Sequence, residues 1–430
     1  MSSDIPHLTR LAEEISRNTA TIADYLKSHD LPQPSFDADG PPHPIHGSDN
    51  DNISAARNAL IEATKALHAL ALGPAETTRL FCFNEIYLLG AMQVLCHFNV
   101  PLHVPLQGEI SMSELAAKSG LHEVLLPRFL RMAAANYYFT ESRPGFVAHT
   151  AWSKTLATDE KMRACVWFRY AEMMPTVAKF VEAVEQFPGS TEPQDAAFHL
   201  AFGDTFFSYK EKNPEHMVKF GLFVDGFASG EAVDSAESIA RAYEWEKLPG
   251  GSLVVDVGGG IGHISAAVAR EHTQLNFHVE DFGDLMEESM ALLEQKGVSN
   301  RVWFVAHNFF EPQPKACQGA AVYFLRNIMH NWSDLYCRRI LKPIVEAMGP
   351  GSRIVVCDIV LPEPNRIPKT KEAHVRALDL TMLSMFNAKE RSRGEWQELF
   401  ASVDSRLKVT AVVGKPKLRR DCLIEARLVQ

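Results

Sequence analysis

Apolar residues recur at helical spacing over most of the first 240 residues. Leu8, Leu11 and Ile15 begin such a pattern, and a segment rich in Pro, Gly, Asp and His, 31–51, follows it. Apolar positions three and four residues apart form one face of a helix, whereas clusters of Pro and Gly interrupt helices. The pattern therefore predicts an N-terminal helix, a mobile linker, and then a mainly α-helical region over residues 53–240.

Part of this region predicts a winged helix. Residues 110–121 combine a serine cap, an acidic first turn and a glycine stop, which are the signals of a short helix. A second helix is expected over 124–135, and residues 137–149 alternate as a β-hairpin does. Winged helices often bind DNA, but the second helix offers only Arg128 and Arg131 to a groove. A packing or dimerisation module is the favoured interpretation.

From Gly251 onward, short apolar runs alternate with helical or loop segments. Runs of about 4–8 apolar residues between turn residues are typical of buried strands. The expected strands are 253–257, 276–279, 302–305, 320–325, 353–359 and 407–413. Such alternation predicts a parallel sheet covered on both faces, that is, a Rossmann-like doubly wound α/β domain. The chain is accordingly divided into a helix and linker over 1–52, a mainly α winged-helix-like region over 53–240, and a cofactor-binding domain over 241–430.

The composition is that of a water-soluble globular protein. Of the 430 residues, 46% are hydrophobic and 22% charged, and no apolar run approaches the roughly 18 residues needed to cross a bilayer. No secretory signal is visible at the N-terminus, so we expect a cytoplasmic protein without membrane association. The seven cysteines include no CxxC pair and are expected to be reduced thiols, and no metal site is expected.

The charge balance points to a small-molecule substrate. The formal net charge is −10, which argues against a nucleic-acid partner held by its phosphates. One short basic cluster, 415–420, lies between two strand-like stretches and is expected to be a solvated turn.

A glycine-rich loop follows the strand 253–257. Asp256 is the last residue but one of this strand, and Gly258, Gly260 and Gly262 follow before a helix begins. Glycine permits the sharp turn and lets the loop backbone approach a ligand where a Cβ would intrude. About 20 residues further on, the next strand ends at Asp281, whose carboxylate can accept hydrogen bonds from ribose hydroxyls. The GGGIGH loop fits S-adenosylmethionine better than a dinucleotide, for which GxGxxG spacing near the start of a domain is expected.

Several motifs in order resemble those of the class II, plant-type small-molecule O-methyltransferases, most similarly the fungal branch attached to secondary-metabolite pathways. The motifs are the helical winged region, the DVGGGIGH loop and the segment FLRNIMHNWSD over 324–334. The resemblance extends over almost the whole chain from about Leu8. It implies a class I methyltransferase fold, S-adenosyl-L-methionine as cofactor, and a homodimer formed through the N-terminal half.

The resemblance also implies a set of cofactor contacts. Residues expected to contact the cofactor are Asp256, Gly258, Gly260, Gly262, Asp281, Phe282, Asn308, Phe309, Arg326 and Trp332. The glycines would pack against the methionine part, Asp281 would bind the ribose, and Trp332 would lie beside the adenine. The family usually has an acidic residue before the aromatic one at Phe309, whereas this chain has Asn308, so the ring contact is kept and the carboxylate is lost.

His330 falls on the family's catalytic histidine. Imidazole exchanges protons near neutral pH, so it can take the proton from a phenol or enol whose oxygen attacks the sulfonium methyl. The family supports this histidine with two acids, which match Asp358 and Glu390, and one of them would fix the ring tautomer. Glu390 lies among basic residues, so a solvated ion pair is its alternative role. The family usually has Asp after the histidine, whereas this chain has Asn331.

Apolar residues at helical spacing are candidates for the substrate wall. They are Phe223 and Phe227 in the α half and Met382 and Phe386 after Asp358. Flat rings and flexible methionines suit an aromatic or polyketide-type substrate, while the simpler interpretation is plain core.

Three functions compete on these grounds. The leading interpretation is an O-methyltransferase that acts on a hydroxyl of an aromatic or polyketide-type small molecule. The second keeps the fold and the bound cofactor but catalyses pericyclic ring formation or dehydration without methyl transfer. Asn331 and Asn308 are the departures that leave this alternative open. The third is a DNA-binding regulator, which the acidic balance disfavours.

Overall fold

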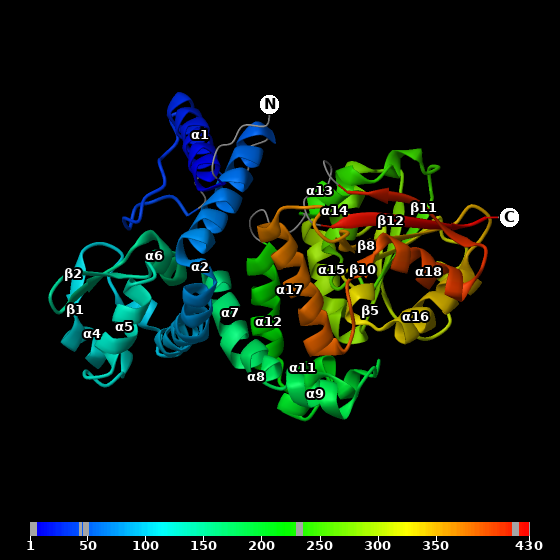
Figure 1. Cartoon of the computed structure of the whole chain (residues 1–430). Coiled ribbons are helices and arrows are strands. Elements are labelled where there is room, and N and C mark those ends of the chain that lie inside the picture. The colour runs from blue at the N-terminus through cyan, green and yellow to red at the C-terminus, as the bar shows by residue number, and fades with distance from the viewer. Residues whose placement is uncertain (1–6, 43–44, 46–50, 229–234, 415–420, 430) are drawn as a thin grey trace, which may run out of the picture. The chain divides into compact units, whose positions relative to one another are not determined.

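The computed structural model describes residues 7–42, 45, 51–228, 235–414 and 421–429, and the chain divides into two compact units (Figure 1). The helical unit consists of Met1–Pro175, Lys210–Glu231 and Pro368–Lys371, and the sheet unit of Thr176–Tyr209, Ala232–Ile367 and Glu372–Gln430. The division at residues 52 and 240 stays a prediction. The basic cluster 415–420, expected to be a solvated turn, lies outside the described residues.

The sheet unit is built on a seven-stranded sheet in the order β11-β12-β8-β7-β4-β5-β6. The strands are β4 Leu253–Val257, β5 Asn276–Asp281, β6 Val302–Ala306, β7 Val322–Arg326, β8 Arg353–Asp358, β11 Leu407–Val413 and β12 Cys422–Leu428. The six strands expected from the sequence are confirmed, with small shifts at their ends. The family fold predicted above is therefore present in this unit.

The sheet is parallel as predicted, except for one strand, β12. Strands β4 to β8 pair in parallel, but β12 runs antiparallel between β8 and β11. The sequence of β12, Cys422–Leu428, mixes apolar residues with Glu425 and Arg427, so it lacks the continuous apolar run that marked the other strands. It is a strand because it finds hydrogen-bonding partners on both sides.

The sheet separates two apolar cores, one on each face. Within β4, Val254 belongs to one core and Val255 to the other, since successive side chains of a strand point to opposite faces. The covering helices are α13 Ala236–Ala242, α14 His263–Glu271 and α15 Met286–Gln295 on the first face, and α16 Asp334–Ala347 and α18 Arg393–Val403 on the second. Coverage of both faces confirms the doubly wound α/β fold.

The sheet unit also contains α9 Phe180–Gln186, α10 Ala197–Phe202, and the strands β9 Val360–Leu361 and β10 Arg391–Ser392. Three helices belong partly to each unit: α8 Met174–Val177, α11 Phe206–Lys212 and α17 Lys369–Phe386. Strands β9 and β10 pair in parallel as a separate two-stranded sheet.

The helical unit contains the two helices and the hairpin that the winged-helix prediction requires. Its elements are α1 His7–Ser28, α2 Asp51–His97, α3 Val100–His103, β1 Glu109–Ser111, α4 Met112–Ser119, α5 Leu126–Ala134, β2 Thr140–Arg143, β3 Phe146–Ala148, α6 Ala151–Thr158, α7 Glu160–Phe168 and α12 Pro214–Ala228. The two helices and the hairpin are as expected, and β1 adds a third antiparallel strand beside β3. Ser111 caps α4 by accepting from the backbone N–H of Glu114 at 3.2 Å, and Gly120 (φ 75°) ends it.

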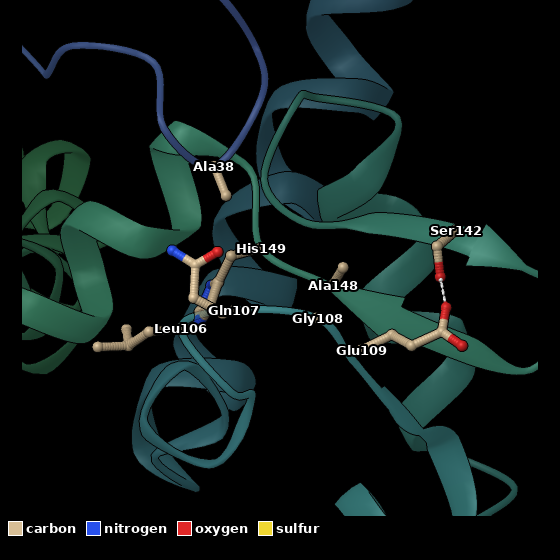
Figure 2. Close-up of a pocket in the computed structure, with 8 residues that line it drawn as sticks. All are labelled: Ala38, Leu106, Gln107, Gly108, Glu109, Ser142, Ala148 and His149. Carbon is tan, nitrogen blue, oxygen red and sulfur yellow. Dashed lines mark hydrogen bonds between the residues drawn. The ribbon is translucent and has the colours of Figure 1, made fainter.

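The segment predicted to be a mobile linker is held against the winged helix where it is described. Phe36 stacks on Tyr137 and Trp152 at ring distances of 4.4 and 4.9 Å, and Asp39 pairs with Lys154 at 3.0 Å. A pocket of about 420 Å³ lies beside this segment (Figure 2). Its lining residues are Ala38, Leu106, Gln107, Gly108, Glu109, Ser142, Ala148 and His149.

Helix α2 is long, apolar and interrupted once. Gly73 has φ 72° and ψ 169°, which no helix allows, so the helix is broken there (Figure 1). Its first part packs along α1, where Ile22, Leu26 and Ala56 form a small core. By length and composition alone Asn52–His97 could cross a membrane, contrary to the sequence expectation. That is weak evidence, because a long helix of a water-soluble protein can pass the same test.

Helices α7 and α12 pack closely through a glycine, and this generates a matched prediction. A Cβ at Gly226 would lie 2.7 Å from the carbonyl oxygen of Lys161, whereas a Cβ at Gly221 on the same helix meets nothing within 4 Å. Gly226→Ala should lower the thermal midpoint of the protein by overpacking the interface, at a cost of about 1–3 kcal/mol. Gly221→Ala should leave the midpoint unchanged or raise it, because alanine favours a helix by up to about 1 kcal/mol. Equal shifts in thermal unfolding would contradict this packing.

Candidate active site

The glycine loop leaves β4 in a backbone conformation that favours glycine. Gly258, Gly260 and Gly262 have φ values of 70°, 58° and 89°. A Cβ at Gly258 would lie 2.6 Å from Ile328 Cδ1, and one at Gly262 would lie 3.1 Å from a methyl group of Val279. The loop lies where β4 has β5 on one side and β7 on the other. Open α/β sheets bind ligands at such a reversal of strand order.

Asp281 holds this loop from the neighbouring strand. One carboxylate oxygen accepts from the backbone N–H of Gly260 and the other from that of Phe282, both at 2.8 Å. Burial raises the pKa of Asp281. The preceding acid, Glu280, is buried and accepts from Gln313 at 3.2 Å instead. Both acids at the end of β5 therefore hold the loop: Asp281 through its carboxylate, and Glu280 through its backbone carbonyl, which accepts from Gly258 and Gly259 at 2.8 and 3.1 Å.

Asp256 supports the loop from inside the protein. Its carboxylate is buried and accepts from the hydroxyl of Ser265 at 2.6 Å. A Cβ at Gly259 would lie 2.6 Å from this carboxyl group, so the loop packs directly on it. Burial raises the pKa of Asp256 to about 6. Its direct contact with the cofactor stays a prediction.

Aromatic residues gather beside the loop. Trp332 packs edge-on against Phe309 and Phe310 at ring distances of 6.1 and 5.0 Å and lies 5.5 Å from Tyr336. Phe309 Cε1 would be 3.7 Å from a Cβ at Gly258. The sequence reasoning placed Phe309 and Trp332 here but missed Phe310 and Tyr336. The sequence signal that could have pointed to Phe310 is its position directly after Phe309.

The remaining cofactor candidates lie at the carboxyl ends of β5, β6 and β7. Asn308 accepts from the backbone N–H of Phe310 at 3.1 Å, so its amide closes the turn after β6. Arg326, at the end of β7, lies 3.9 Å from Asp421, which sequence reasoning missed because it belongs to none of the motifs. Phe282 is exposed at the end of β5.

His330 is bonded to a buried carboxylate. It lies on the 3₁₀ turn Met329–Asn331 after β7, and its Nδ1 is 2.9 Å from Glu390 Oε1. The Glu390 side chain is 1% exposed, which excludes a solvated ion pair. Its backbone N–H donates to Asp379 at 3.0 Å. With Nδ1 donating to the carboxylate, Nε2 carries the lone pair of the neutral ring and is the nitrogen that can take a proton.

Asp358 and Asn331 lie close to His330 with different roles. Asp358 is fully buried at the end of β8, and neither of its carboxylate oxygens has a hydrogen-bonding partner within the described ranges. Burial raises the pKa of Asp358 to about 7, and the electrostatic interaction with His330 opposes the rise. Asn331 donates to the carbonyl of Asn327 at 2.9 Å, so it stabilises the turn. Glu390 is therefore the acid with a direct bond to the ring.

The substrate candidates fall in separate units. In the sheet unit, Phe386 of α17 lies 5.5 Å from Phe207, which in turn lies 6.3 Å from Trp332. Met382 is buried on the same helix. In the helical unit, Phe223 stacks on Phe168 at 4.1 Å and neighbours Phe227 at 5.7 Å. Phe207 was missed from the sequence, because no motif marks it.

These features define a class of protein, a methyltransferase with a glycine-loop cofactor site and a carboxylate-bound histidine. The chain belongs to the O-methyltransferase family: the family model for the O-methyltransferase domain matches residues 183–404. O-methyltransferase bik3 of Gibberella fujikuroi is 33% identical, over 94% of this chain and 89% of that protein. O-methyltransferase aurJ of Gibberella zeae is 35% identical, over 92% of each.

A solved structure agrees with this assignment. The O-methyltransferase NcsB1 from neocarzinostatin biosynthesis is 26% identical, covers 80% of this chain and 96% of its own, and matches with a TM-score of 0.65. It was solved with S-adenosylmethionine and 2-hydroxy-5-methyl naphthoic acid. The glycine positions that a Cβ would fill, together with Asp281, fit the same cofactor here. This chain is an S-adenosylmethionine-dependent O-methyltransferase.

The burial of Asp358 predicts a pH-dependent stability effect. The folded protein keeps this carboxyl protonated up to about pH 7, whereas the unfolded chain releases the proton near pH 4. Between these values the folded state binds more protons, so this group makes the protein less stable as pH rises. Asp358→Asn removes the effect, so the stability of the variant relative to wild type should be higher at pH 8 than at pH 5.

A matched control is Asp404→Asn. Arg406 lowers the pKa of Asp404 to about 2, so its contribution changes only below about pH 4. The difference between this variant and wild type should therefore stay constant from pH 5 to pH 8. The measurement is the thermal midpoint of each variant and of wild type across this range. If the difference for Asp358→Asn also stayed constant with pH, the raised pKa of Asp358 would be refuted.

Proposed function

We propose that this enzyme methylates a hydroxyl of an aromatic or polyketide-type secondary metabolite, with His330 as the general base. The observation that carries the proposal is the 2.9 Å bond from His330 Nδ1 to the buried Glu390 carboxylate. A histidine held in this way presents its second nitrogen to a substrate hydroxyl. The carboxylate also stabilises the positive charge that the ring gains with the proton.

The mechanism assigns one task to each residue. Bound S-adenosylmethionine supplies an electrophilic methyl group on a sulfonium centre. His330 Nε2 takes the hydroxyl proton as the substrate oxygen forms its bond to that methyl group and the sulfur–carbon bond breaks. Glu390 fixes the ring orientation, and Asp281 with the glycine loop orients the ribose and methionine parts.

The row of rings supports a planar substrate. Phe386, Phe207 and Trp332 form a continuous aromatic wall in the sheet unit. Flat aromatic surfaces bind planar, weakly polar ligands by offset stacking. The naphthoic acid bound by NcsB1 belongs to this chemical class.

Substitution of the base and its partner tests the proposal. His330→Ala should lower kcat roughly 10²- to 10⁴-fold while the cofactor affinity stays close to wild type, because the ring acts on the hydroxyl proton. Glu390→Gln keeps a hydrogen-bond acceptor but loses the charge, so a smaller loss is expected. Transfer of a labelled methyl group to an aromatic hydroxyl substrate measures kcat, and calorimetry measures cofactor affinity.

Product mass separates this activity from its alternative. A cyclase or dehydratase on the same fold would give a product without an added methyl group and would not consume the cofactor. Asn331 bonds within its own turn, so the departure from the family's aspartate does not by itself favour that alternative. If the His330→Ala variant transferred the methyl group at the wild-type rate, His330 would not be the general base.

We further propose that the helical unit forms a homodimer through α2. All residues from 81 to 87 are exposed, which is nearly two full turns of helix. Among them Phe81, Phe83, Ile86 and Tyr87 are 57–71% exposed. Large apolar side chains exposed on all sides of a helix indicate an interaction surface, and a second copy of the same helix offers a matching surface that would bury them.

Two lysine substitutions in this exposed segment test whether the protein forms the proposed dimer. Phe81→Lys with Phe83→Lys should convert a dimer into a monomer of 47.9 kDa in sedimentation equilibrium, since lysines would be buried at the interface. Val181→Lys, at an equally exposed apolar residue of α9, should leave the mass unchanged. A monomeric wild type that floats with phospholipid vesicles would overturn the proposal in favour of a membrane surface.

A further inference from the structure

We propose that Arg391 is a positioning residue for the reaction, because its guanidinium group fixes the backbone turn that carries His330. The inference rests on the proposed role of His330 as base. Arg391 follows Glu390 directly, so adjacent residues would control the ring and the backbone of the same histidine.

The guanidinium group bonds on both sides of His330. Its Nη1 donates to the carbonyl of Met329 at 3.0 Å, and its Nη2 donates to the carbonyl of Trp332 at 2.8 Å. These carbonyls belong to the residue before the histidine and the second residue after it. The two bonds therefore bridge the 3₁₀ turn and fix the position of the backbone from which the His330 side chain extends.

The guanidinium group is itself held in place. Its Nε donates to Asp334, at the start of α16, at 2.8 Å, and Nη2 reaches Cys337 Sγ at 3.3 Å. Its central carbon lies 5.3 Å from the ring centre of Trp396 on α18. Arg391 is 0% exposed. A charge buried this deeply is tolerated because Asp334 neutralises it and each of its nitrogens has an acceptor.

Only arginine has the shape for this task. Its planar group directs donors along three sides, so one side faces Asp334 while the others face the two carbonyls. A lysine would place a single ammonium group at one point, so it could not hold Asp334 and both carbonyls with separate, fixed donors. The strand β10 anchors the residue further, since Arg391 pairs with Val360 of β9.

A double-mutant cycle tests whether Arg391 acts through His330. Arg391→Lys should lower kcat roughly 10- to 100-fold by displacing the imidazole, while KM for the cofactor stays near wild type. In the His330→Ala background the same substitution should change the residual rate less than about twofold, because no base remains to be displaced. Single-turnover transfer of the labelled methyl group measures all four rates.

Two further variants complete the design. Arg393→Lys alters the neighbouring exposed arginine and should leave kcat unchanged. Asp334→Asn leaves the arginine in place but removes its charged anchor, so it should lower kcat less than Arg391→Lys does. If Arg391→Lys does not fold, the cycle is run with Asp334→Asn.

The outcomes separate the two proposals. Equal losses of rate with and without His330 would show that Arg391 serves folding alone, which overturns this inference and leaves the base intact. A fully active His330→Ala variant would remove the base itself and this inference with it.

Discussion

The active site depends on the parallel alignment of four neighbouring strands, β4, β5, β7 and β8. Parallel neighbours end at the same edge of a sheet, so the glycine loop, Asp281, the turn of His330 and Asp358 all reach one edge. The cofactor loop and the base are separated by about seventy residues in sequence, and the sheet brings their strands side by side. The positions of the glycine loop and of the His330 turn both depend on this alignment.

The ionisable groups at this edge are stabilised unequally. Glu390 bonds to His330 and Arg391 is fully paired, whereas Asp358 is buried without a hydrogen-bonding partner among the residues described. A carboxyl group in such a place costs free energy whenever it is charged. Ionisable groups with strongly shifted pKa values are frequent at functional sites, where the fold supplies the stability elsewhere.

One short segment after α17 ties several parts of the sheet unit together. Asn387 donates to the carbonyls of Ser190 and Glu192 at 3.0 Å. Three residues later Glu390 holds the histidine ring, and Arg391 holds its backbone. This segment therefore contacts the loop before α10, the turn of His330 and strand β9.

The sequence alone determined the alternation of strands and helices, the glycine loop, Asp281 and, through the resemblance, His330 with its two acids. These features are readable because steric preferences and side-chain periodicity act over a few residues. Tertiary structure alone decided the antiparallel place of β12, the bond of Glu390 rather than Asp358 to the histidine, and the position of Phe207 beside Trp332. Tertiary structure also decided the contacts of Arg391, which joins segments almost sixty residues apart. No local pattern encodes such contacts, since they depend on how distant segments pack once the cores have formed.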